Sequence, residues 1–108
     1  MKEIRAYIQP FMLEKLTQKL LEIPGFPGMS VSTCEGFGQK KATEIQNYTP
    51  FVTKKRLEIF AADDMVEVIF NTIMVFAKTH QHGAGKVYVV DVERGGRICT
   101  GEQGADLA

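Results

Sequence analysis

The strongest constraint on the fold is a change in the period of the apolar residues along the chain. Residues 3–9, EIRAYIQ, alternate apolar and polar side chains, which is the period of a strand with one buried face. After Pro10 the apolar residues recur every three or four positions over residues 11–23, which predicts an amphipathic helix. The segment PGFPG then ends the helix, because proline and glycine interrupt helical structure.

The next part of the chain returns to the period of strands. Residues 29–35 and 55–61 alternate again, and they predict a second and a third strand. The residues GFG at 36–38 are expected to end the second strand. Between the two strands, a polar segment without a sustained period predicts a long exposed loop at about residues 39–53.

A second helix and a fourth strand complete the pattern. Asp63 and Asp64 are expected to supply an N-cap and a favourable first-turn charge for a helix that continues to about residue 78. The segment KVYVVDV at 86–92 predicts the fourth strand, and residues 94–101 predict a short extended piece before a small, polar C-terminal tail. The buried stripe of the second helix is expected to consist of Val66, Ile69, Ile73 and Phe76.

The resulting order, β-α-β-β-α-β, predicts a ferredoxin-like α+β sandwich, and 108 residues suit a single domain over residues 1–108. Such a sandwich has one sheet face covered by helices and one bare face. The bare face is expected to carry Tyr7, Phe60 and Tyr88, and exposure of these rings to water is unfavourable. A closed homo-oligomer in which the sheets pack on one another is therefore the expected solution.

The charges and cysteines exclude several classes of protein. Lys plus Arg and Asp plus Glu both number 13, so the chain has no basic footprint for nucleic acid or for an anionic membrane. Cys34 and Cys99 lie far apart without a Cys-x-x-Cys pattern, which favours a reduced, cytoplasmic protein. The N-terminal segment lacks the features of a signal peptide, and no apolar stretch is long enough for insertion into a bilayer.

The segment THQHGAGKVYVV, residues 79–90, has two interpretations. It is not a Walker-type phosphate loop, because His80 stands where the first glycine would fall, Val87 follows the lysine, and a strand comes next. Gly83 and Gly85 could bring backbone N–H groups close to an anion, and Lys86 adds an ammonium group. The alternative is a helix C-cap followed by the charged start of a strand.

Four short motifs, taken together, resemble the PII signal-transduction proteins, the nitrogen regulatory family. They are PGM at 27–29, GFG at 36–38, GAGK at 83–86 and RICTGE at 97–102, and IQPFMLEKL and LEIFAADDMVE add to the match. The resemblance implies a homotrimer that binds adenine nucleotides (ADP, AMP or ATP) in the clefts between subunits. It implies a site made by Gly28, Met29 and Ser30 of one subunit and by Gly36, Phe37, Gly38, Glu58, Phe60, Gly83, Gly85 and Lys86 of its neighbour, with Arg97 reaching the phosphates.

The chain departs from the family pattern at several of these positions. Cys99 stands where the family usually has a second arginine, and Gln39 replaces the arginine that follows GFG. Each lost charge-assisted contact is worth about 1.5–3 kcal/mol, so ADP or AMP are expected to compete well with ATP. Lys40 and Gln9 replace family residues linked to 2-oxoglutarate, which speaks against sensing of that effector.

The loop at about 39–53 corresponds to the effector and partner-binding element of the family, and it is shorter here than usual. Tyr48 lacks the motif for uridylylation, so it is not expected to be a modification site. The resemblance implies a divergent PII-like regulator that controls a partner protein, such as a membrane transporter for inorganic carbon or metal, or an enzyme.

A metal-related function is the alternative that the residues leave open. His80 and His82 form His-x-His, and with Cys34 or Cys99 they could bind zinc or copper, although a polar helix end explains the same pattern. Catalysis is not expected, because no Ser/His/Asp or Cys/His set and no recognisable pair of carboxylates is present.

Overall fold

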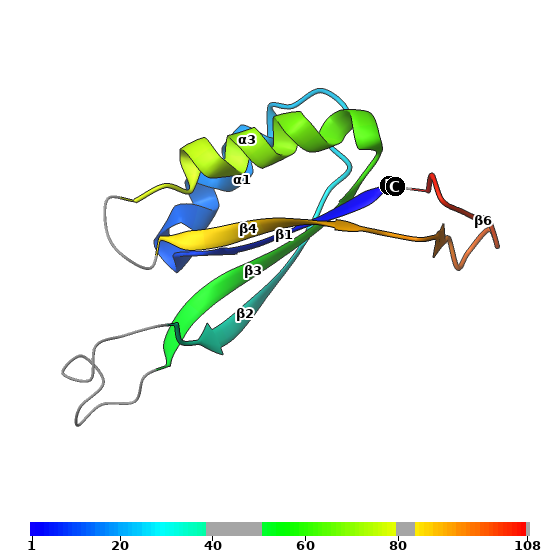
Figure 1. The fold of residues 1–108 in the computed structure, drawn as a ribbon. Coiled ribbons are helices and arrows are strands. Elements are labelled where there is room, and N and C mark those ends of the chain that lie inside the picture. Colours follow the sequence, from blue (N-terminus) through cyan, green and yellow to red (C-terminus); the bar gives the residue numbers. More distant parts are fainter. Residues whose placement is uncertain (39–50, 80–83, 108) are drawn as a thin grey trace.

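The central strand of the structure is β1 (Lys2–Ile8), which pairs with a different strand on each side. The computed structural model describes residues 1–38, 51–79 and 84–107. They form a four-stranded antiparallel sheet in the order β2-β3-β1-β4, with α1 and α3 on one face (Figure 1). The other elements are η1 (Pro10–Met12), α1 (Leu13–Leu21), β2 (Ser30–Gly36), β3 (Val52–Ala61), η2 (Asp63–Met65), α3 (Val66–Phe76), β4 (Gly85–Asp91), β5 (Gly95–Gly96) and β6 (Gln103–Gly104).

The predicted ferredoxin-like order is confirmed, and the period of two explains the two faces of the sheet. Ile4 of β1 lies opposite Ile59 of β3 and Val89 of β4, and these residues face the helices. Ile4 and Ile59 are fully buried, whereas Val89 on the edge strand stays 42% exposed. The helices therefore cover the centre of the sheet more completely than its β4 edge.

The helices close the core with the apolar residues that recur at helical spacing. Leu16 and Leu20 of α1 and Ile69 and Ile73 of α3 are all buried against the sheet. Val66 and Phe76, also expected in the buried stripe, are only partly buried at its margins. Burial of these side chains is the main source of stability, at about 25 cal/mol per Å² of apolar surface removed from water.

Several predicted boundaries are wrong. β2 is shifted by one residue from the predicted 29–35 and ends at Gly36, within the GFG that was expected to end it, and β3 begins at Val52, inside the segment expected to be a loop. The remainder of that loop, residues 39–50, lies outside the described residues. The C-terminal tail also contains structure that the sequence did not predict, because Gln103–Gly104 pairs with Gly95–Gly96 as a small antiparallel hairpin.

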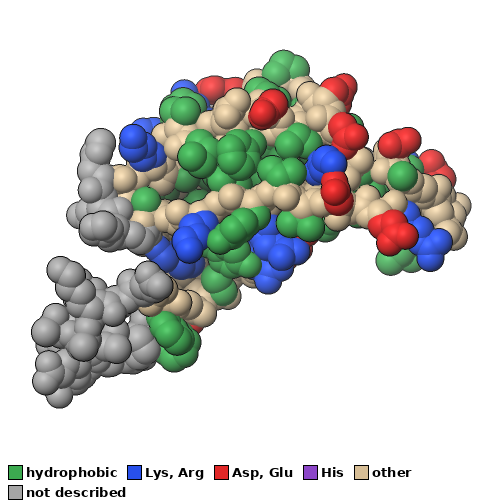
Figure 2. All heavy atoms as spheres, viewed as in Figure 1, with side chains coloured by type: hydrophobic (Ala, Val, Ile, Leu, Met, Phe, Trp, Pro, Cys, Tyr) green, Lys and Arg blue, Asp and Glu red, His purple; other side chains and the backbone are tan. Residues whose placement is uncertain are grey.

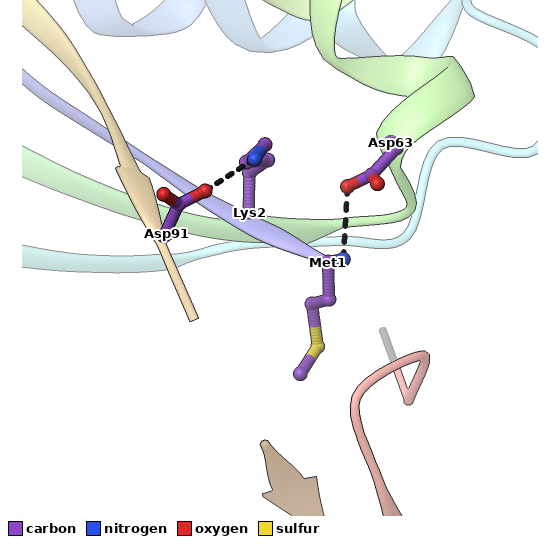
Figure 3. A network of polar contacts seen from close by, with 4 residues as sticks. All are labelled: Met1, Lys2, Asp63 and Asp91. Atoms are coloured by element: carbon purple, nitrogen blue, oxygen red, sulfur yellow. Dashed lines mark hydrogen bonds and ion pairs between the residues drawn. The ribbon is translucent and has the colours of Figure 1, made fainter. Parts of the chain in front are cut away.

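The expected N-cap role of Asp63 is also wrong. Neither Asp63 nor Asp64 caps the helix with its side chain; both lie in the first turn of η2, whose N-cap is Ala62. The Asp63 carboxylate instead accepts a 2.8 Å hydrogen bond from the α-ammonium group of Met1, next to the contact between Lys2 and Asp91 (Figure 3). Asp63 therefore joins the start of β1 to the start of the second helical segment.

The hydrogen bond and the charge of the Met1 ammonium group lower the pKa of Asp63 below its usual value of 3.8. A carboxyl group with a lowered folded-state pKa stabilises the fold above its unfolded pKa, and this contribution disappears as the pH falls through the folded pKa. We predict that Asp63→Asn lowers the melting temperature at neutral pH. The difference from the wild type should shrink below about pH 4. Thermal unfolding followed by circular dichroism tests this, and a difference that is independent of pH would contradict it.

Candidate functional site

The candidate site is built on the sheet face that the helices leave uncovered, which we call the open face. Ser30, Glu58, Arg5 and Tyr88 lie side by side on it, one on each strand, because they are partners in the register. Phe60, Tyr88 and Val90 on this face are 44%, 48% and 39% exposed. Figure 2 shows Lys and Arg side chains among hydrophobic ones on the side of the sheet away from the helices.

The first group of predicted site residues, which we call the lysine group, lies at the end of the sheet where β1 finishes. Gly85 lies opposite Ile8 and Lys86 opposite Tyr7. A Cβ atom on Gly85 would lie 1.9 Å from the carbonyl oxygen of Tyr7, and the backbone φ is +129°, so only glycine fits there. The lysine group consists of Gly36, Phe37, Gly38, Gly85 and Lys86.

The end of β2 in the lysine group is marked by an aromatic pair. Phe37 packs edge-to-face on Phe51, with 5.1 Å between ring centroids, and both rings are largely exposed. The last residue of β1, Ile8, pairs with Lys55 of β3. Gly36 pairs with Val52, which lies three residues further along β3 toward the loop. This part of the β2–β3 hairpin therefore projects past the end of β1.

The second group, which we call the glutamate group, extends from the middle of the sheet away from the lysine group. Glu58 is the partner of Ser30, and Phe60, two residues further along β3, is the partner of Glu3. Met29 is partly buried against the core, and Gly28 has a positive φ of 102°. The glutamate group consists of Gly28, Met29, Ser30, Glu58 and Phe60.

Arg97 lies on the β5–β6 hairpin, beyond the end of β4 (Figure 1). Its guanidinium Nη1 is 3.2 Å from a carboxylate oxygen of Glu102, and its backbone N–H donates to the Glu102 carbonyl. The Thr100 hydroxyl also donates to the Glu102 carboxylate. These contacts hold the arginine beside an open hollow of about 430 Å³ that is lined by residues 94–98 and 101–103.

A single chain does not bring the cationic residues of the two ends together. Asp91 follows Lys86 by five positions along β4, which corresponds to about 17 Å at 3.3 Å per residue. Arg97 follows beyond Asp91, across the connection to β5. One phosphate chain therefore cannot contact Lys86 and Arg97 of the same protomer.

Some of the predicted residues lie outside the described part of the chain. These are Gly83, His80 and His82, together with Gln39, Lys40 and Tyr48 of the loop. Within residues 1–38, 51–79 and 84–107, no three His, Cys, Asp or Glu side chains are close enough to hold a metal ion together. Cys34 and Cys99 are both free thiols. The metal-related alternative therefore gains no support from the described residues.

A charged network on the open face was not predicted from the sequence. Glu3 is buried, with 5% exposure, and accepts hydrogen bonds of 3.0 and 2.7 Å from Nε and Nη2 of Arg5. These bonds and the carboxylate charge raise the pKa of Arg5. Arg56 and Glu58 form a second pair at 3.3 Å. The alternation that places Arg5, Arg56 and Glu58 on the open face was visible in the sequence, but their pairing depends on the register.

Comparison with known proteins identifies the family. The model of the family "Nitrogen regulatory protein P-II" matches residues 1–102. The chain is also 38% identical to a nitrogen regulatory protein P-II of Cereibacter sphaeroides, with 98% of each chain covered. The chain belongs to the nitrogen regulatory protein P-II family. A P-II relative from Pasteurella multocida is 39% identical over 98% of both chains, and nitrogen regulatory protein P-II 1 of Escherichia coli is 40% identical over 95% of this chain and 96% of its own length.

Membership of the P-II family confirms the resemblance that the short motifs indicated. P-II proteins are trimeric regulators that interact with partner proteins, and signal transduction rather than catalysis is their general role. Among the helices of the described ranges, none combines the length and the apolar character needed to cross a membrane.

The close contact at Gly85 makes a specific prediction for stability. Gly85→Ala should destabilise the protein by more than about 1 kcal/mol, because the new methyl group meets the Tyr7 carbonyl and the positive φ disfavours alanine. Gly36→Ala is the matched control, since no atom lies within 4 Å of its Cβ position, and its effect should stay within about 0.5 kcal/mol. Urea unfolding measures both, and equal effects would contradict the assignment.

Proposed function

We propose that this chain forms a homotrimer that binds an adenine nucleotide (ADP, AMP or ATP) in each cleft between protomers, and thereby controls a partner protein. The observation that carries the proposal is the separation of two candidate cations, because Lys86 lies near the start of β4 and Arg97 lies beyond its end. The lysine group and Arg97 are too far apart to act on one ligand within a protomer. A complete site therefore needs residues from two chains, as expected for a cleft between subunits.

The register supports a different proposal for how these residues are divided between the two protomers. The family resemblance implied Ser30 from one subunit and Glu58 from its neighbour, whereas these residues are side-by-side partners in one chain. A cleft that uses Ser30 of one protomer therefore has Glu58 of that same protomer beside it. We assign the glutamate group and Arg97 to one protomer, and the lysine group, with Gly83 outside the described residues, to its neighbour.

The chemistry of the two groups suits a nucleotide. Glycine allows backbone N–H groups to approach the phosphates closely, and Lys86 and Arg97 supply charge-assisted donors. Phe60, which is 44% exposed, offers an aromatic surface for a base. The partly buried Met29, also in the glutamate group, adds apolar surface. Glu58 offers an acceptor for a hydroxyl or amino group of the ligand.

The open face supports the trimer. Phe60, Tyr88 and Val90 lie on it and remain exposed in a single chain. Neighbouring exposed apolar side chains of this kind commonly mark a protein–protein interface. Packing of three open faces on one another would cover Tyr88 and Val90 and leave Phe60 at the cleft. Trimers are also typical of the P-II family.

The loop at about 39–53 is the proposed binding element for the partner protein. The strands that lead into and out of it, β2 and β3, carry site residues at both ends, including Gly36 and Glu58. A ligand that contacts these strands can therefore shift the population of loop conformations. We propose a membrane transporter or an enzyme as the partner, and the cytoplasm as the location.

Lys86 provides the first test. Lys86→Ala should weaken ATP binding roughly tenfold to a hundredfold, because one charge-assisted contact is worth about 1.5–3 kcal/mol. Lys15→Ala is the matched control, since it removes an exposed lysine from α1, on the opposite side of the sheet. Titration calorimetry on the trimer measures both. Absence of ATP binding to the wild type, or equal affinities of the two variants, would overturn the proposal.

The order of affinities among adenylates provides the second test. With Cys99 in place of a second arginine, ATP should bind no more than about tenfold more tightly than ADP, because the third phosphate finds one charged partner fewer. Cys99→Arg should then increase the preference for ATP. Calorimetric titrations with ATP, ADP and AMP at one salt concentration measure this, and a wild-type preference for ATP above a hundredfold would contradict it.

A further inference from the structure

A row of alternating charges crosses the middle of the open face. Glu3 and Arg5 lie two residues apart on β1, and Glu58 and Arg56 lie two residues apart on β3. The register sets Arg5 directly opposite Glu58 and Tyr7 directly opposite Arg56. Each acidic residue is therefore next to at least one arginine, and the site residue Glu58 lies between two of them.

The two arginines, Arg5 and Arg56, differ in how they contact their carboxylate partners. Arg5 donates two hydrogen bonds to the buried carboxylate of Glu3, so its guanidinium group is held on that residue. Within residues 1–38, 51–79 and 84–107, Arg56 has no such bidentate partner. Its Nε atom lies 3.3 Å from Oε1 of Glu58, which makes Glu58 the carboxylate with which Arg56 pairs.

Arg56 is also held from a second direction. Its guanidinium carbon lies 5.9 Å from the centre of the Tyr7 ring, within the range of a cation–π interaction. The Arg56 Nε atom is buried, yet it makes no hydrogen bond within the described part of the chain. A buried donor without a hydrogen bond is costly, and a small rotation of the nearby Glu58 carboxylate would satisfy it.

We propose that Arg56 is a positioning residue that holds the Glu58 carboxylate in the orientation needed to accept a hydrogen bond from the bound nucleotide, with Tyr7 supporting the guanidinium group. This inference rests on the proposed nucleotide site. An ionised carboxylate only accepts hydrogen bonds, so its counterpart on the ligand is a ribose hydroxyl or the amino group of the base. One Glu58 oxygen binds that donor while the other aligns with Arg56 Nε.

A double-mutant cycle tests whether Arg56 acts through Glu58. We expect Arg56→Gln to weaken ATP binding about threefold to thirtyfold, Glu58→Gln to weaken it at least as much, and the double variant to be no worse than Glu58→Gln alone. Lys55→Gln is the matched control, since it removes a positive charge from the neighbouring residue, whose side chain lies on the other face of β3. Its affinity for ATP should equal that of the wild type.

Two ligand analogues identify the donor that Glu58 binds. 2′-Deoxy-ATP lacks a ribose hydroxyl, and inosine triphosphate lacks the amino group of the base. The wild type should bind one of them more weakly than ATP, and this discrimination should be reduced in Arg56→Gln and largely restored in Arg56→Lys, which keeps the positive charge. A purely structural role of Arg56 would lower the melting temperature without changing the ratio of ATP to analogue affinity.

The outcomes separate the inference from the proposed function. If the wild type does not bind ATP, the proposed function fails. If the wild type binds ATP while Arg56→Gln binds it equally well, or if the losses of Arg56→Gln and Glu58→Gln simply add, the positioning role is overturned and the nucleotide site stands. If Arg56→Gln does not fold, Arg56→Met, which also removes the charge but keeps an unbranched side chain, takes its place in the cycle, and additivity with Glu58→Gln again overturns the inference.

Discussion

The structure depends on the double pairing of β1. This strand hydrogen-bonds to β3 on one side and β4 on the other, and its even-numbered residues Ile4, Ala6 and Ile8 form the centre of the core beneath both helices. A slip of one residue would turn this set to the open face and bring Arg5 and Tyr7 into the core. Burial of the three apolar side chains therefore fixes the register of the whole sheet.

That register gives the open face its properties. It places aromatic, apolar and charged side chains in rows across four strands, with Arg5 between Glu3 and Glu58. The same rows separate Lys86 from Arg97, so that the candidate binding residues of one chain belong to different ends of the sheet. In the proposed trimer, a protomer built in this way gains both a covered surface and complete ligand sites.

Local patterns in the sequence were sufficient to predict the elements and their faces. The change between periods of two and three to four residues gave the order of strands and helices, and it assigned Ile69 and Ile73 to the core and Phe60 to the open face, because side-chain direction follows from backbone geometry. Prediction was poorer where the contact of a side chain depends on a segment that is distant in the sequence. Asp63 was expected to cap a helix, but its partner is the ammonium group of a residue 62 positions earlier.

The sequence by itself determined the fold class and, through its short motifs, membership of the P-II family. Only the tertiary structure decided which candidate residues are neighbours, such as Ser30 with Glu58 and Glu58 with Arg56, and which are kept apart. The reason is that periodicity is a relation between residues only a few positions apart in the chain. Contacts across a sheet join residues that are distant in the chain, and their pairing is set by the packing of the core as a whole.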